Sequence, residues 1–113
     1  MPLDRDAASI QDITISCRKI GEFIQGMDYK VFSEDERTQS AVILQILIIG
    51  EATKRLSADF LKKHPDIPWD KIARTRDILI HHYEGIDVEE IWRIARFDIP
   101  NLLSSIKSIE NIP

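Results

Sequence analysis

Arg76, His81 and Tyr83 are the residues of this chain whose types and spacing suggest chemistry. They lie in the segment RDILIHHY, where His81 follows Arg76 by five positions and Tyr83 follows it by seven. Arginine carries a permanently charged planar fork that matches phosphate or carboxylate oxygens, and histidine exchanges protons near neutral pH. Arg76 also has apolar neighbours at i−4, i+3 and i+4, which are positions of a buried helix stripe. Its charge therefore requires a partner side chain, a substrate or a subunit interface.

The segment from Pro68 to Tyr83 is the predicted helix that carries this motif. Pro68 fits the first turn, where a missing N–H does no harm, and Gly85 is a suitable stop. In a regular helix, five residues place Arg76 and His81 about 140° apart around the axis and about 7.5 Å apart along it. Both side chains reach one ligand only if the last turn loosens or if a second subunit contributes the same residues. Because a two-fold axis beside this helix would bring two motifs into one cleft, we expect a homodimer.

Asp77 and Glu51 are candidate supporting residues. Asp77 lies four positions before His81, so its carboxylate could hold the imidazole in one orientation. Glu51 ends an apolar helical segment and has two interpretations, a solvated charge or a partner of a buried cation such as Arg76. The sequence leaves these two interpretations open.

Apolar residues recur at helical spacing in most of the chain. One stripe runs from Ile10 to Met27, and a capping box at Ser33 and Glu36 is predicted to open the next helix. That helix is apolar almost all round from residue 41 to 49, which predicts a central position.

Ser57 is a candidate cap for a short helix that ends before Pro65. A box at residues 87 and 90 opens the last helix, which Pro100 is expected to bend. We therefore predict an all-α antiparallel bundle of about four long helices and one short one.

Length and composition fit a single globular domain over residues 1–113. Hydrophobic residues make up 43% and charged residues 30% of the chain. A lone cysteine, Cys17, excludes an internal disulfide and suits a reducing cytoplasm. The longest apolar run, AVILQILIIG, is shorter than the roughly 20 residues that span a bilayer, and no signal peptide is recognisable. The net charge of −4 argues against bulk coating of nucleic acid but allows a local contact.

Several motifs together resemble one family. One motif resembles the signature of the HEPN superfamily, specifically of the small HepT-like toxins. It consists of Arg76, four intervening residues, His81, one further residue and Tyr83. Further matches are IIGEATKRLS at 48–57, PW at 68–69, HHYEGID at 81–87 and a final helix with an internal proline. The resemblance covers essentially the whole chain.

The resemblance implies a toxin of a toxin-antitoxin pair, of a type II or type VII-like kind. Such a toxin is a metal-independent ribonuclease whose active site forms across a homodimer. Its partner would be a minimal nucleotidyltransferase antitoxin that binds it and transfers AMP to the motif tyrosine. Residue by residue, Arg76 and His81 would be catalytic, Asp77 supporting and Tyr83 the AMPylated position.

The residue types fit that chemistry. Cleavage of RNA by its own 2′-OH needs a group that moves protons and a cation that stabilises the charged transition state, and it needs no metal or cofactor. Lys71, Arg74 and His82 are candidate RNA contacts, although a solvated basic face explains them equally well. The three histidines lack a suitably spaced carboxylate, so we expect no metal site.

Two other function classes remain open from the sequence. In one, the chain is a non-catalytic partner or substrate-binding subunit of a nucleotidyltransferase, and Arg76 and His81 serve the dimer interface. In the other, the chain is a helical adaptor without chemistry. Growth arrest that depends on Arg76 and His81 would separate a toxin from both.

Overall fold

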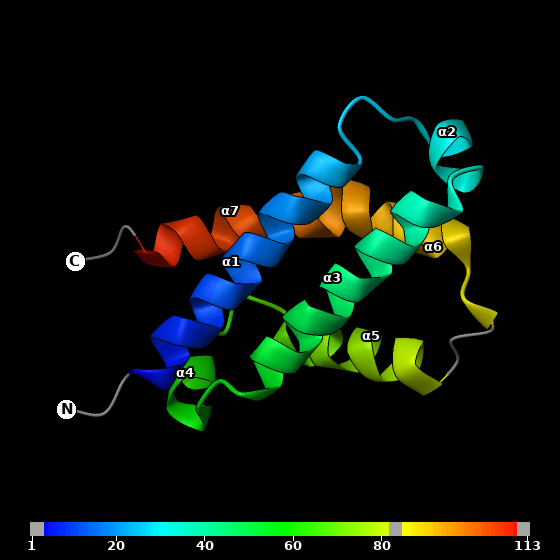
Figure 1. The fold of residues 1–113 in the computed structure, drawn as a ribbon. Coiled ribbons are helices and arrows are strands. Elements are labelled where there is room, and N and C mark those ends of the chain that lie inside the picture. The colour runs from blue at the N-terminus through cyan, green and yellow to red at the C-terminus, as the bar shows by residue number, and fades with distance from the viewer. Residues whose placement is uncertain (1–3, 82–84, 111–113) are drawn as a thin grey trace.

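The computed structural model describes residues 4–81 and 85–110, and in them the chain forms helices and turns and no strand. Short helical elements separate the long helices along the chain (Figure 1). The elements are α1 (Arg5–Phe23), α2 (Tyr29–Ser33), α3 (Glu36–Lys54), α4 (Ala58–Lys63), α5 (Trp69–His81), α6 (Val88–Arg93), the π-helix η2 (Ile94–Asp98) and α7 (Ile99–Glu110). The four long helices confirm the predicted bundle, and the structure adds short helices to the one that we expected.

Helix α3 occupies the centre of the bundle, as predicted from its composition. It packs on α1 and α5 and also contacts α2 and α6, whereas α7 lies against α1. In Figure 1, α1 and α3 lie side by side and run in opposite directions, and α5 lies below α3. An exposed ion pair at 3.3 Å joins Asp12 of α1 to Arg55, the residue that follows α3.

The apolar residues at helical spacing in the first helix and in the last helical segment form much of the core. In both helices the buried positions recur at steps of three and four, which places them on one face. The buried members are Ile10, Ile13, Cys17, Ile20 and Ile24 from the first stripe and Ile91, Ala95, Ile99, Leu102 and Ile106 from the last. The predicted helix periodicity therefore identifies the core residues correctly.

Helix α3 is less completely covered than we expected. Leu44 and Ile48 lie one turn apart on it, and their exposed fractions are 55% and 37%. The helices packed around α3 leave this stripe open, so the all-round apolar composition does not correspond to all-round burial.

Ser33 does not cap α3, contrary to the prediction. The cap is Asp35, whose carboxylate accepts hydrogen bonds from the backbone N–H and the hydroxyl of Thr38. Ser33 instead ends α2, and its hydroxyl donates to the carbonyl of Lys30. Aspartate and serine are comparably good caps, so which of them is used depends on where the chain turns.

The caps at Ser57 and Asp87 are confirmed. The Ser57 hydroxyl accepts a bond from the N–H of Phe60, and it donates to Asp6 of α1, which ties α4 to the start of the chain. Asp87 accepts from the N–H of Glu89, but Glu90 completes no capping box because its carboxylate binds Arg93. Ser57 and Asp87 nevertheless cap the first turns of α4 and α6.

The last helical segment changes its winding shortly before Pro100. The turn from Ile94 to Asp98 is a π-helix, and α7 follows it without a break. Proline cannot donate a backbone hydrogen bond, and its ring crowds the carbonyl of the preceding turn, so a widened turn relieves both problems. The irregularity expected at Pro100 therefore takes the form of a π-turn.

None of the helices in residues 4–81 and 85–110 is long and apolar enough to cross a membrane.

Candidate active site

Gly50 brings helices α3 and α5 into close contact at the position of Arg76. A Cβ atom on Gly50 would lie 2.1 Å from the Cβ atom of Arg76 and 2.6 Å from its Cγ atom. Such distances are far below van der Waals contact, so only glycine allows the arginine stem to lie against the backbone of α3. Sequence reasoning gave Gly50 no structural role, although a glycine inside a strongly apolar helix is a signal of close approach.

Two carboxylates hold the guanidinium of Arg76. Its Nη2 atom lies 2.9 Å from Oε2 of Glu51, and its Nη1 atom lies 2.9 Å from Oδ1 of Asp77. The arginine side chain is 24% exposed and that of Glu51 is 50% exposed, so the pair sits at the surface with the cation on the inner side. Glu51 forms the ion pair with Arg76 and is also half exposed to solvent, so each of its two interpretations describes part of its surroundings.

Asp77 contacts different partners from those expected. Its Oδ1 atom also accepts a hydrogen bond from Nζ of Lys54, at 2.6 Å. The hydrogen bonds from Lys54 and, second, from Arg76 lower the pKa of the Asp77 carboxyl below its ordinary value. Within the described residues no hydrogen bond joins Asp77 to His81. Helix α3 lies on that side of α5 and supplies a cation, and this tertiary contact replaces the expected local one.

His81 is the last described residue of α5 and is exposed. Because α5 stays α-helical up to His81, the imidazole and the Arg76 guanidinium leave the helix in different directions, as a regular helix requires. Up to His81, α5 contains no loosened turn that would bring the imidazole and the guanidinium together. The two other candidates in this stretch, His82 and Tyr83, lie outside the described residues.

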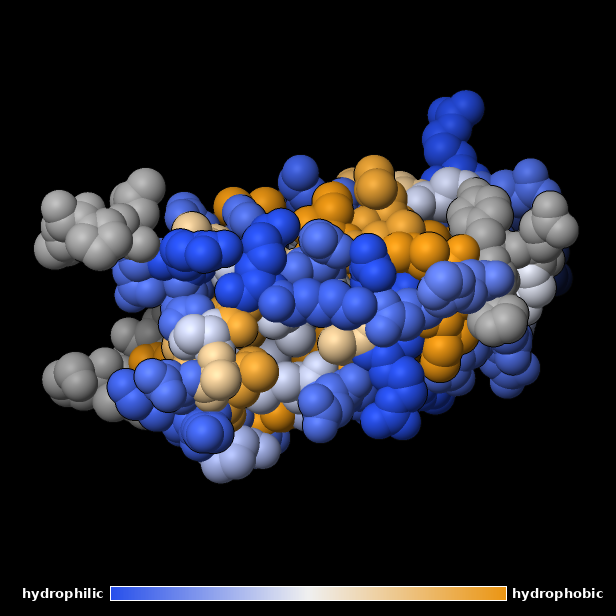
Figure 2. Space-filling view, turned by 90° about the horizontal axis from the view of Figure 1, so that it is seen from below, coloured by the Kyte–Doolittle hydropathy of each residue, from blue (hydrophilic) through white to orange (hydrophobic). Residues whose placement is uncertain are grey.

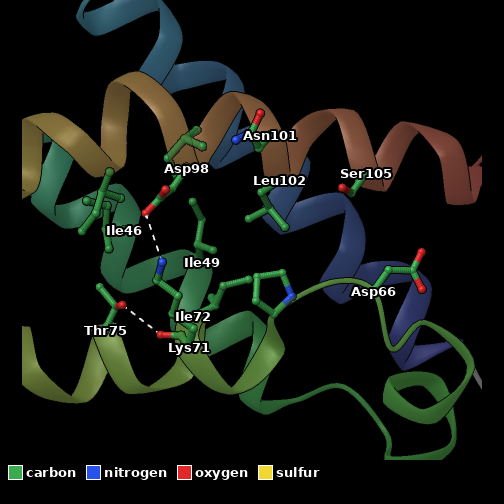
Figure 3. A pocket seen from close by; sticks show the side chains of 13 residues that line it. Ile46, Ile49, Asp66, Lys71, Ile72, Thr75, Asp98, Asn101, Leu102 and Ser105 are labelled. Atoms are coloured by element: carbon green, nitrogen blue, oxygen red, sulfur yellow. Dashed lines mark hydrogen bonds and ion pairs between the residues drawn. The ribbon is translucent and has the colours of Figure 1, made fainter.

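Lys71 is directed away from the Arg76 cluster. Its Nζ atom lies 3.9 Å from Oδ2 of Asp98 in η2. The two side chains meet at a cavity of about 280 Å³ between α5 and α7, which has Ile49 and Leu102 on its walls (Figure 3).

Arg74 is exposed and lies beside a shallow depression between α4 and α5. The structure therefore separates Lys71 from the site, and Arg76, Asp77 and Glu51 are the candidates that it brings together.

The family comparison covers every residue of this cluster. The model of the HepT-like ribonuclease family matches residues 13–109, nearly the whole chain. The chain belongs to this family. The match includes both helices that meet at Gly50 and the complete arginine and histidine motif.

Three proteins similar to this chain carry names that describe them as ribonucleases. A "Putative RNase" of Methanocaldococcus jannaschii is 44% identical over 112 residues, which cover 99% of this chain and 90% of the relative. The "Probable ribonuclease HepT" of Thermococcus cleftensis is 41% identical over 88% of this chain and 91% of its own length. A "Putative RNase" of Caldanaerobacter subterraneus is 35% identical over 88% of this chain and 89% of its own length. No solved structure matches the chain significantly.

Proposed function

We propose that this HepT-like chain is a metal-independent endoribonuclease and the toxin of a toxin-antitoxin pair. The observation that carries the proposal is the guanidinium of Arg76, held in place by Glu51 and Asp77 at the surface of the bundle. A guanidinium has five N–H donors, so these two contacts leave donors for a phosphate group. An exposed imidazole, that of His81, ends the same helix.

The proposed reaction uses the RNA's own 2′-hydroxyl as the nucleophile. The 2′-oxygen attacks the adjacent phosphorus while an imidazole of His81 accepts its proton. The bond between phosphorus and the 5′-oxygen breaks, and this oxygen takes a proton from a second, protonated imidazole. The products are a 2′,3′-cyclic phosphate and a 5′-hydroxyl. Arg76 stabilises the charge that builds up on the phosphate oxygens in the transition state.

A homodimer would supply the second imidazole and close the site. Leu44 and Ile48 form an exposed apolar stripe on α3 that continues, one turn later, to Glu51. On α5, Ile80 is 43% exposed and lies one turn after Arg76. We call these three apolar residues the α3–α5 stripe. Viewed from the side of α4 and α5, the surface shows an apolar area beside hydrophilic side chains (Figure 2). An apolar surface next to the ionic cluster is suited to a two-fold contact that brings two motifs together.

The proposed partner is a minimal nucleotidyltransferase antitoxin that transfers AMP to Tyr83. In a helix that continued past His81, Tyr83 would follow Arg76 by two turns on the same side. AMP at that position would add bulk and a negative charge beside Arg76, and so compete with RNA for the cation. Co-expression with the antitoxin should add the mass of one AMP to the wild-type chain and none to Tyr83→Phe.

The central test is RNA cleavage and bacterial growth with Arg76→Ala and His81→Ala. Each substitution should lower the cleavage rate about 10²- to 10³-fold and relieve growth arrest, because each removes one group that acts in the transition state. Arg37→Ala, which removes an exposed arginine from the first turn of α3, is the matched control and should behave as wild type. Cleavage by the wild type should persist in EDTA.

The toxin proposal would be contradicted if neither the wild type nor the variants slowed bacterial growth and if none of them cleaved RNA in vitro. That result would favour the non-catalytic partner of a nucleotidyltransferase.

A further inference from the structure

Lys54, the last residue of α3, lies beside Arg76 although the two residues belong to different helices. The Nζ atom of Lys54 and the Nη1 atom of Arg76 lie 2.6 and 2.9 Å from the same atom, Oδ1 of Asp77. One carboxylate oxygen thus brings an ammonium and a guanidinium together at the helix crossing. Both side chains remain partly exposed, so an anion from solvent can reach them.

The two cations retain hydrogen-bond donors after these contacts. An ammonium has three N–H donors and a guanidinium has five, and Asp77 and Glu51 use only some of them. The non-bridging oxygens of one phosphate group can accept bonds from two neighbouring cations at the same time. The Asp77 carboxylate meanwhile offsets the repulsion between the two positive charges.

The next residue, Arg55, shows that this placement is particular to Lys54. Arg55 is also a cation at the end of α3, and its Nη2 atom lies 3.3 Å from Asp12 of α1. The last turn of α3 therefore directs one cation towards α5 and the other towards α1. Only the first of them shares a carboxylate with Arg76.

We propose that Lys54 is a second phosphate-binding residue, which holds the RNA backbone together with Arg76. This inference rests on the proposed nuclease function and names a residue that acts in it. Lys54 contributes mainly to binding, because its charge contacts the phosphate before the reaction and during it. Its removal therefore raises KM more than it lowers kcat.

The test is the binding of a single-stranded 2′-O-methyl RNA, which lacks the nucleophile and cannot be cleaved. Compared with wild type, Lys54→Gln should weaken binding about tenfold, the effect of one charge-assisted hydrogen bond. It should also lower the slope of log affinity against log salt by about one. Lys54→Arg should keep most of the affinity. Arg55→Gln removes the same charge from the neighbouring residue and should bind as wild type does.

Cleavage kinetics and thermal unfolding complete the test. With cleavable RNA, Lys54→Gln should raise KM about tenfold and leave kcat within about threefold of wild type. Similar unfolding temperatures for the two glutamine variants exclude a folding defect as the cause. The inference is overturned if Lys54→Gln and Arg55→Gln bind equally well, or if Lys54→Gln loses kcat with an unchanged salt slope. If no protein cleaves RNA but the binding difference remains, the nuclease proposal fails and the phosphate site stands.

Discussion

At Gly50, the absence of a side chain sets the position of the arginine on which the site depends. The stem of Arg76 lies against the backbone of α3, and the guanidinium then reaches Glu51, the residue after the glycine. The close approach of the two helices and the ion pair between Arg76 and Glu51 therefore both depend on Gly50. A larger residue at position 50 would disturb both.

Gly50→Ala should destabilise the protein and reduce RNA cleavage. The added Cβ atom would overlap Arg76, and relieving such overpacking costs about 1–3 kcal/mol of unfolding free energy. Urea unfolding and a cleavage assay measure the two effects. Gly21→Ala is the control, because nothing lies within 4 Å of its added Cβ atom, and it should be neutral or stabilising by up to about 1 kcal/mol. An unfolding free energy of Gly50→Ala equal to that of wild type would contradict the described helix contact.

Asp77 should contribute to stability in a pH-dependent way. Its pKa in the folded protein is lowered, first by Lys54 and then by Arg76, so its contribution is present above the unfolded pKa of about 4. The contribution is lost as the pH falls through the lower, folded pKa. The difference in Tm between wild type and Asp77→Asn should thus be constant from about pH 7 to 5 and shrink towards pH 2.

Other carboxylates with lowered pKa values, such as those of Asp6, Asp35 and Glu90, are common to both proteins and cancel in this comparison. A difference in Tm that grows on acidification would contradict the assigned ion pairs.

At the scale of the helices, capping decides where α3 begins. Asp35 and Ser33 both have side chains that can cap a helix, but only Asp35 bonds to the first turn, through Thr38. Asp35→Ala should therefore lower the Tm by a few degrees, whereas Ser33→Ala should leave it nearly unchanged. Thermal unfolding followed by circular dichroism measures both. Equal losses in the two variants would show that the turn between α2 and α3 differs from the one described.

The burial of the apolar face of α1 leads to a second prediction at this scale, which concerns the reactivity of the Cys17 thiol. Burial raises the pKa of the Cys17 thiol to about 12, so almost no thiolate exists at neutral pH. A thiol reagent at pH 8 should label Cys17 only as fast as the protein unfolds and at once in denaturant. Rapid labelling of the native protein would mean that α1 separates from its neighbours far more often than a core helix should.

At the scale of the whole molecule, the α3–α5 stripe is the surface that we assign to the dimer. Leu44→Glu with Ile48→Glu should yield a monomer with its fold intact and with RNA cleavage reduced at least tenfold, because a buried charge at each position opposes association. Light scattering and the cleavage assay measure the two properties. Val31→Glu changes an equally exposed residue on α2 and should leave the mass and the activity unchanged. A fully active monomeric wild type would contradict the shared site.

The sequence alone determined the four long helices and most of the core, because both depend on local spacing. The three- and four-residue steps that include Ile13, Ile20 and Ile106 place these residues on one face of a helix whatever the neighbouring helices do. The same spacing separates Arg76 from His81 around α5. The motif itself was also sufficient to suggest the family to which the chain belongs.

Tertiary structure decided which partners the charged residues have. By spacing alone, Asp77 could bind His81 and Glu51 could lack an ionic partner, but α3 crosses α5 at Gly50 and joins Glu51 to Arg76 and Lys54 to Asp77. Residues 51 and 76 are far apart in the chain, and no periodicity within one helix encodes where another helix crosses it. An ion pair across such a crossing can be identified only when both backbones are in place, because its strength depends on distances of a few ångströms.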